Sequence, residues 1–514
     1  MSDTLDFQWE WQTPFEEGTP EGVTFASLRL LVAGRVATEL EDLVAQTLRD
    51  DVFISAYPLA CFLADNWWRL RWEPAPARPD AAWRLRHSLA AVGDGYAWPD
   101  VTFASDGEAV QVQVTGSRQS ATSPVRYLAS YEEWVPAVAF EHAVDRFLEG
   151  VMGRLEAMGQ RDSDLTVSWG EIQKERANPH AARWRRLEAM AGYDPDEAPQ
   201  AFIEALLGET ESAGWPALQE LAASSRSRAL EDLKTLRDAL HGRGIRYRVA
   251  DLKQLLRRLP HTGADSTRPP WQRAAQAARH ARLQWGLDGE VLSNRRLGEI
   301  LDLPEEALGS GDDATPTAPY SASLRSVESG SDRLILKGRP TTSRRFAACR
   351  LIGDRLYGVD DDSPLAAATN AYTARQKFQR AFAQELLCPF DALHELLHLE
   401  TASPSDDDIE GAAEHFQVSP LLVRTTLVNR HVLSRDVLDE AMQVNAPKSA
   451  EWRNGAHEAT VIPTAHPAIP FPSTVSSTSI RRRLGLCRSR NPSSNDFHSP
   501  RDFSLAYTLR ILRR

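Results

Sequence analysis

The residues whose spacing most clearly suggests chemistry are His394, Glu395 and His398, which form the pattern His-Glu-x-x-His. On a helix, two histidines four residues apart point from one face, where their imidazole nitrogens can bind Zn²⁺. The glutamate between them can take a proton from a metal-bound water. With Glu410 or Glu414 as a third ligand, this segment would make the protein a zinc endopeptidase.

The sequence around this motif favours a simpler interpretation. The segment 389–400 is short, and the polar run 403–408 follows it. No strand pattern precedes it to supply the usual edge for a peptide substrate. A short amphipathic helix whose two histidines bind no metal accounts for the same residues. Zinc binding through His394 and His398 is therefore kept as an alternative.

Two other segments carry a longer pattern. Residues 344–356 read RRFAACRLIGDRL, and residues 379–389 read QRAFAQELLCP. They resemble the two signature blocks of the ImmA/IrrE metallopeptidase-like family, roughly RFTLAHELGHLL and FAAELLMP. A leading helical segment from 271 and a strand pattern at 333–340 also follow the order of elements in that family. The resemblance covers about a third of the chain and implies a mostly helical, zincin-like domain.

The resemblance also implies that the zinc ligands are missing. Aligning the Arg-Phe pair at 345–346 with that of the family puts Arg350, Leu351 and Asp354 where His, Glu and His belong. Gln376 then stands where a third, carboxylate ligand belongs. A guanidinium stays protonated and has no lone pair to offer a metal, and leucine accepts no proton. We therefore expect a degenerate site with no catalytic residue, metal or cofactor.

Arg350 and Asp354 are four residues apart on the predicted helix, so they can form an ion pair on one face. Our hypothesis is that this pair, joined by Gln376, fills the space of the lost zinc site. In the alternative, both residues are solvated surface charges. The first expectation is a noncatalytic regulatory or protein-binding protein that keeps the cleft as a docking surface for an unknown protein partner.

Residues 405–431 read as a helix, a turn at 418–420 and a second helix, which is the shape of a helix-turn-helix. The second helix offers Arg424, Asn429 and Arg430 for DNA contacts. These residues do not form a basic stripe, and packing of the two helices explains the pattern as well. A DNA-binding transcriptional regulator is therefore a further alternative.

Composition narrows the classes of function. A net charge of -12 over 514 residues argues against a broadly basic surface for nucleic acid. The sequence shows no run of eighteen apolar residues and no signal-peptide pattern, which favours a protein without a membrane span. The 4 cysteines form no CxxC pair. Together these features favour a cytoplasmic protein. Walker A loops, dinucleotide-binding glycine turns and Gly-x-Ser-x-Gly elbows are also missing from the sequence.

These patterns predict a multidomain protein of the α+β class. Residues 1–135 mix strand and helix patterns, including strict alternation at 109–114 and a strand-turn-strand pattern at 28–36, and predict an α/β domain of unknown role. Residues 136–268 show helical periodicity, and the resemblance implies that residues 269–440 form a zincin-like, ImmA/IrrE-type domain. From 446 to 514 the chain has eleven Lys+Arg against four Asp+Glu and little periodicity, which predicts a disordered basic tail.

Overall fold

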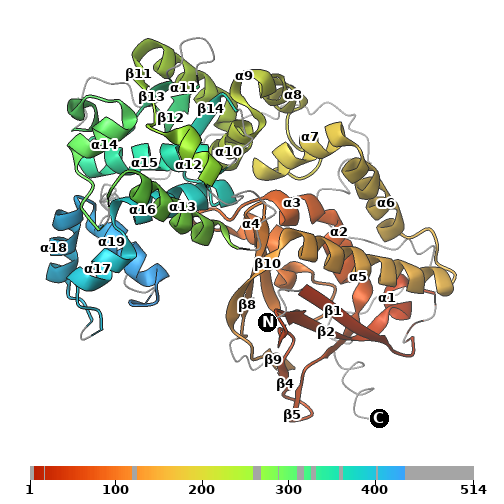
Figure 1. Cartoon of the computed structure of the whole chain (residues 1–514). Helices are drawn as coiled ribbons and strands as arrows, with labels where there is room; N and C mark the ends of the chain where they lie inside the picture. The colour runs from red at the N-terminus through yellow and green to blue at the C-terminus, as the bar shows by residue number, and fades with distance from the viewer. Residues whose placement is uncertain are drawn as a thin grey trace, which may run out of the picture.

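The computed structural model describes residues 5–14, 16, 18–117, 124–258, 268–287, 289–309, 318–325, 332–357, 363–400 and 403–434. Within these ranges the chain is of the α+β class, with several small antiparallel sheets and many helices (Figure 1). No helix in the same ranges has both the length and the apolar character that a membrane span requires. The tail predicted at 446–514 lies outside the described residues.

The N-terminal part holds two sheets against a long helix, α5 (Ala137–Ala157). In the first sheet, β2 pairs antiparallel with β1, β3 and β6, and Gly34 forms the turn between β2 and β3 with a φ of +78°. In the second sheet, β8 lies between β7 and β10, and alternate residues of β8 are buried. The strand predicted at 109–114 and the strand-turn-strand predicted at 28–36 are both confirmed.

A third, smaller sheet has the order β5-β4-β9. The strands of this part are β1 (Leu5–Trp11), β2 (Phe25–Val32), β3 (Arg35–Val36), β4 (Leu40–Asp42), β5 (Thr47–Arg49), β6 (Val52–Ser55), β7 (Asp100–Ser105), β8 (Ala109–Thr115), β9 (Val125–Tyr127) and β10 (Tyr131–Pro136). Its shorter helices are α1 (Pro20–Val23), α2 (Ala56–Asp65), α3 (Trp67–Trp72) and α4 (Ala81–His87).

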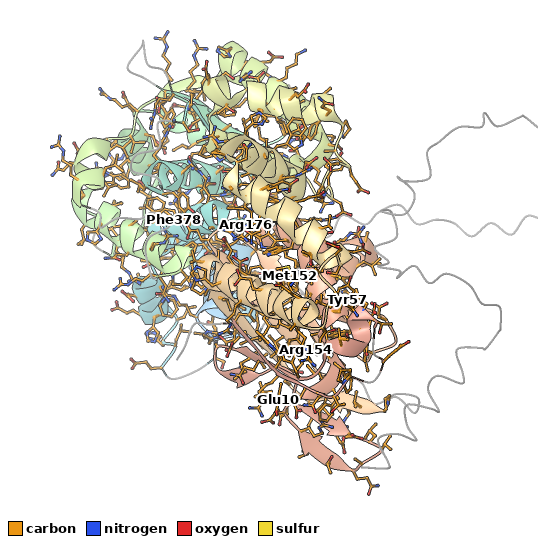
Figure 2. The ribbon with its side chains drawn as sticks, turned by 90° about the vertical axis from the view of Figure 1, so that its right-hand side faces the viewer. Glu10, Tyr57, Met152, Arg154, Arg176 and Phe378 are labelled. Atoms are coloured by element: carbon orange, nitrogen blue, oxygen red, sulfur yellow. The ribbon has the colours of Figure 1, made fainter. Side chains whose placement is uncertain are left out.

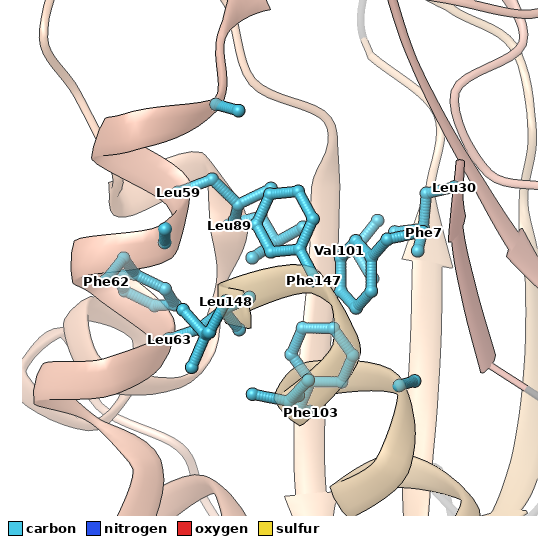
Figure 3. Packing of buried hydrophobic residues seen from close by; sticks show 14 of the residues in the cluster. Phe7, Leu30, Leu59, Phe62, Leu63, Leu89, Val101, Phe103, Phe147 and Leu148 are labelled. Carbon is cyan, nitrogen blue, oxygen red and sulfur yellow. The ribbon is translucent and has the colours of Figure 1, made fainter. Parts of the chain in front are cut away.

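Helix α5 belongs to the core of the N-terminal part. Its apolar residues recur every three or four positions, which puts them on one face toward the sheets. Phe147 stacks on Phe7 of β1 with ring centroids 4.9 Å apart (Figure 3). The same core continues into α6 (Asp164–Ala177) through Leu165 and Trp169. The boundary predicted at residue 135 therefore separates residues that share one hydrophobic core.

Helices α6 to α11 form the middle of the chain. Arg176 of α6, labelled in Figure 2, is ion-paired with Asp145 of α5 at 2.7 Å. The later helices of this part share a buried cluster with Ala322 and Leu365, which lie on strands of the C-terminal part. The remaining helices are α7 (Pro179–Met190), α8 (Gln200–Gly208), α9 (Thr210–Ala213), α10 (Trp215–Ser225) and α11 (Ala229–Arg243).

The C-terminal part has one antiparallel sheet of order β11-β13-β12-β14. Its edge strand β11 (Ile245–Tyr247) comes from the region predicted as helical, so a domain boundary at 268 would cut through this sheet. Strand β13 precedes helix α15 directly, as the sequence pattern indicates. The other strands are β12 (Ser321–Leu324), β13 (Asp332–Ile335) and β14 (Leu365–Ala368).

Three helices of the C-terminal part pack together beside this sheet: α16 contacts both α13 and α15 (Figure 1). The helices of this part are α12 (Leu252–Arg258), α13 (Pro270–Gln284), α14 (Asn294–Leu301), α15 (Thr341–Tyr357), α16 (Ala374–Leu387), α17 (Phe390–Leu396), α18 (Asp406–Phe416) and α19 (Pro420–Asn429). Single-turn 3₁₀ helices span Leu89–Ala91, Arg226–Arg228 and Glu305–Leu308.

We expect Phe147→Ala to destabilise the N-terminal core by about 3–5 kcal/mol, because the substitution leaves a cavity against Phe7. Chemical unfolding followed by tryptophan fluorescence measures the change. Val138→Ala on the same helix is the control, because Val138 is 61% exposed and its truncation should have little effect. Equal effects of the two substitutions would contradict the assignment of α5 to this core.

Candidate functional site

The positions predicted to correspond to a lost zinc site lie together in the structure. Arg350 on α15 donates from Nη2 to Oε1 of Gln376 on α16, at 2.5 Å. The same nitrogen donates to the backbone carbonyl oxygen of Thr369 at 2.6 Å. One turn further along α15, Asp354 accepts a hydrogen bond from Nε2 of Gln379 at 2.6 Å. Residues from two separate segments thus form one polar network between α15 and α16.

The ion pair predicted between Arg350 and Asp354 is wrong. Asp354 is paired with Arg375, whose Nε and Nη2 lie 2.6 and 2.8 Å from the two carboxylate oxygens. This two-point contact satisfies the carboxylate, while Arg350 is directed to the loop carbonyl before α16. The alternative of solvated charges is also wrong, because Arg350 is 8% exposed and Asp354 is 3% exposed.

Burial shapes the acid-base properties of this network. Burial, reinforced by the nearby positive charge of Arg380, lowers the pKa of Arg350 to about 9. Burial alone would raise the pKa of Asp354, but the charge and hydrogen bonds of Arg375 outweigh it and lower that pKa. Asp354 is therefore held as a carboxylate, and its ion pair with Arg375 is internal.

The close approach of α15 and α16 depends on a glycine. A Cβ atom added to Gly353 would lie 3.0 Å from the side chain of Phe382 on α16. Leu351, which the sequence resemblance places at the position of a general base, is buried among the apolar residues of the same core. The two helices are thus packed through apolar contacts on one side and joined by the polar network on another.

Sequence reasoning missed Glu220, a buried carboxyl group that α10 brings to this network. Oγ1 of Thr373, the N-cap residue of α16, lies 2.9 and 2.8 Å from the two oxygens of Glu220. Burial raises the pKa of Glu220. The only local signal is that Glu220, next to Gln219, lies between two leucines, Leu218 and Leu221, of a mostly apolar helix.

The N-terminal part covers another portion of the same helices. The turn between β7 and β8 places Asp106 2.8 Å from Nζ of Lys377 on α16. In that turn Glu108 accepts a hydrogen bond from the hydroxyl of Tyr357 and is paired with Arg273 of α13. Glu220 of α10 and this turn therefore contact α16 beside the positions where the sequence predicts a cleft.

The His-Glu-x-x-His segment does not keep helical geometry through its second histidine. Helix α17 ends at Leu396, and His398 has a φ of +48°, in the left-handed region. His394 and His398 therefore do not share one helix face, which the zinc-binding arrangement requires. Glu410 and Glu414 are exposed on α18.

Helices α18 and α19 pack against each other with a short turn between them, as predicted. Two of the three candidate DNA contacts on the second helix already have acidic partners. Arg424 lies 2.8 Å from Asp406, and Arg430 lies 3.5 Å from Glu385. Asn429 is exposed at the end of α19. The inner face of α19 is buried, which agrees with a packing role.

Comparisons of the chain with protein-family models, with curated proteins and with solved structures find no significant match.

Removing one member of the buried ion pair, by Asp354→Ala, is expected to destabilise the protein by about 3–5 kcal/mol, because the substitution removes the buried carboxylate that Arg375 contacts at two points. The control is Glu299→Ala, which breaks the exposed pair between Arg296 and Glu299 and should cost less than about 1 kcal/mol. Urea unfolding of both variants tests this. A cost for Asp354→Ala no larger than the control would refute a buried, coupled pair.

The raised pKa of Glu220 predicts a pH dependence of stability. A carboxyl group with a higher pKa in the folded state binds more protons folded than unfolded, so its contribution weakens as pH rises above the unfolded value of about 4.3. Glu220→Gln should remove this loss, so the variant should gain stability relative to the original protein between acid and neutral pH. Thermal unfolding across that range measures it, and parallel pH profiles would contradict the expectation.

Proposed function

We propose that this protein is a noncatalytic regulatory or protein-binding protein related to the ImmA/IrrE peptidases, with a zincin-like C-terminal part. The observation that carries the proposal is the guanidinium of Arg350, held between the Thr369 carbonyl and Gln376 where a metal ligand would stand. A protonated guanidinium offers a metal no lone pair, so these residues do not fit zinc.

The convergence of the aligned positions supports the relationship. The resemblance alone singles out positions 350, 354 and 376, from two segments of unrelated local sequence. In the structure, side chains at the first and third positions are hydrogen-bonded, and the second is linked to α16 through Gln379. A chance resemblance gives no reason for these positions to meet between two adjacent helices.

In this proposal the former catalytic cleft serves as an internal junction. The polar network joins α15 and α16 to α10 through Thr373 and Glu220, and Lys377 and Tyr357 join them to the N-terminal turn. Arg350, Asp354 and Gln376 are all buried, so solvent has little access to them. A regulatory role through a protein partner, in a cytoplasmic setting, then involves surfaces outside the junction.

The two alternative functions have less support. Zinc peptidase activity through His394 and His398 requires a helix that continues past Leu396, where α17 ends. Sequence-specific DNA binding through α19 requires basic side chains that are free to reach DNA, whereas Arg424 and Arg430 are paired with carboxylates.

The test is metal content and peptidase activity of the purified protein. We expect substoichiometric zinc by elemental mass spectrometry and no cleavage of a mixed peptide library. Replacing both His394 and His398 with alanine should change neither the zinc content nor the absence of peptide cleavage. Stoichiometric zinc, together with cleavage that a chelator abolishes, would overturn the proposal. Loss of that cleavage in the double variant would assign it to the His-Glu-x-x-His segment.

A further inference from the structure

His87 of α4 is a fully buried histidine whose two ring nitrogens both face oxygen atoms. Its Nδ1 lies 2.8 Å from the backbone carbonyl oxygen of Phe103 on β7. Its Nε2 lies 2.9 Å from Oε2 of Glu73, the residue that caps the end of α3. A carbonyl oxygen and a carboxylate oxygen only accept hydrogen bonds, so each nitrogen needs its own proton to make its contact. A neutral imidazole carries one such proton, whereas an imidazolium carries two.

The group that faces Nε2 is a carboxylate. Oε2 of Glu73 also accepts a hydrogen bond from Nε of Arg69 at 2.6 Å, so it already acts as an acceptor toward a second donor. Burial alone would raise the pKa of Glu73, but the hydrogen bonds and charges of His87 and Arg69 outweigh it and lower that pKa. The proton between Glu73 and His87 therefore belongs to the histidine.

A stacked indole also favours the charged form of His87. The ring of Trp83, one turn earlier on α4, lies nearly parallel to the imidazole, with centroids 4.1 Å apart and an angle of 8° between the planes. The face of an indole attracts a cation, and the attraction is stronger where water is excluded. Both side chains are buried, so an imidazolium gains more from this contact than a neutral ring does.

The contacts of Glu73 continue into the middle of the chain. Arg69 also donates from Nη1 to Oδ1 of Asp194, which lies between α7 and α8, at 2.8 Å. Arg86 of α4 donates from Nε to the other oxygen of Asp194 at 2.9 Å. In the same segment, a Cβ atom added to Gly192 would lie 3.3 Å from Oε1 of Glu73. The N-terminal part and the middle of the chain therefore meet around this carboxylate.

Two cations beside Glu73 oppose a second proton on His87. Arg69 is one, and its charge is shared with Asp194. Arg226 is the other, with Nη2 3.5 Å from Oε1 of Glu73, and its side chain is 46% exposed, so solvent screens its charge. On its other sides His87 meets a neutral carbonyl and an indole. The carboxylate is therefore the charged group in direct contact with the imidazole.

We infer that His87 is a buried imidazolium and that it makes the contact between the N-terminal part and the middle of the chain a pH-dependent lock. Loss of the proton from Nε2 leaves a nitrogen lone pair facing the Glu73 carboxylate, so the contact becomes repulsive. Because Arg69 joins Glu73 to Asp194, the change reaches the segment between α7 and α8. The inference uses none of the residues on which the proposed function rests.

Folding is then linked to the uptake of a proton by His87. In an unfolded chain a histidine loses this proton near a pH of about 6.5. The folded protein keeps the proton to higher pH, so the stabilisation is fully present below about pH 6.5 and is lost as His87 deprotonates in alkaline solution. The lock is tighter in mildly acidic than in alkaline solution.

The experiment is ¹⁵N NMR of the full chain labelled only at histidine. At about pH 8 an ordinary histidine is neutral, and its two ring nitrogens then have different chemical shifts. We expect one histidine with both ring nitrogens protonated at this pH, and His87→Gln should remove its signals. Glu73→Gln should convert this ring to the neutral form, because the amide carries no charge and can donate to Nε2. The control is His142→Gln, which removes an exposed histidine of α5 and should leave those signals unchanged.

Absence of any doubly protonated histidine in the original protein at this pH overturns the inference, whether or not the variants fold. Persistence of the signals in folded Glu73→Gln or His87→Gln also overturns it. Urea unfolding gives a second measurement: as pH rises above about 6.5, the original protein should lose stability relative to Glu73→Gln. The pH dependence of Glu220 cancels in this comparison, because both proteins contain that residue. Parallel pH profiles of the two proteins would contradict the lock.

Discussion

Burial of the Arg350 guanidinium between α15 and α16 is the constraint on which the other features of the site depend. A charged group removed from water must find acceptors, and the Thr369 carbonyl and Gln376 supply them. The first acceptor fixes the loop that leads into α16, and the second fixes the first turn of that helix. Thr373, which caps the same helix, then faces Glu220 on α10.

Helix α16, which this constraint positions, joins the three parts of the chain. Helix α16 contributes Thr373 to the helical middle and Lys377 to the N-terminal turn. Both contacts are polar and largely buried, so removing one partner costs more than breaking a surface ion pair. The segment that resembles the metal-binding region of a peptidase is thus the place where the three parts of the chain contact one another.

Local patterns in the sequence predict the strands and turns of this structure better than they predict its long-range contacts. The strand predicted from alternating apolar residues at 109–114 and the turn predicted at Gly34 depend only on neighbouring residues. Both are found as expected. The convergence of Arg350 and Gln376 was also accessible, through a resemblance that places both on facing helices. Pairing of Asp354 with Arg375 depends on side-chain direction, which spacing does not determine. Glu220 lies more than a hundred residues from its partners, and nothing in its own segment indicates them.

In the function we propose, position 350 and its neighbours occupy a former metal site. The most direct test is metal binding by a variant with Arg350→His, Asp354→His and Gln376→Glu. Metal binding is measured by the absorption of added cobalt and by the zinc content after dialysis. If the claim holds, this variant binds one equivalent of metal that the original protein does not, since two imidazoles and a carboxylate then meet between α15 and α16. A folded variant that binds no more metal than the original protein would contradict the account.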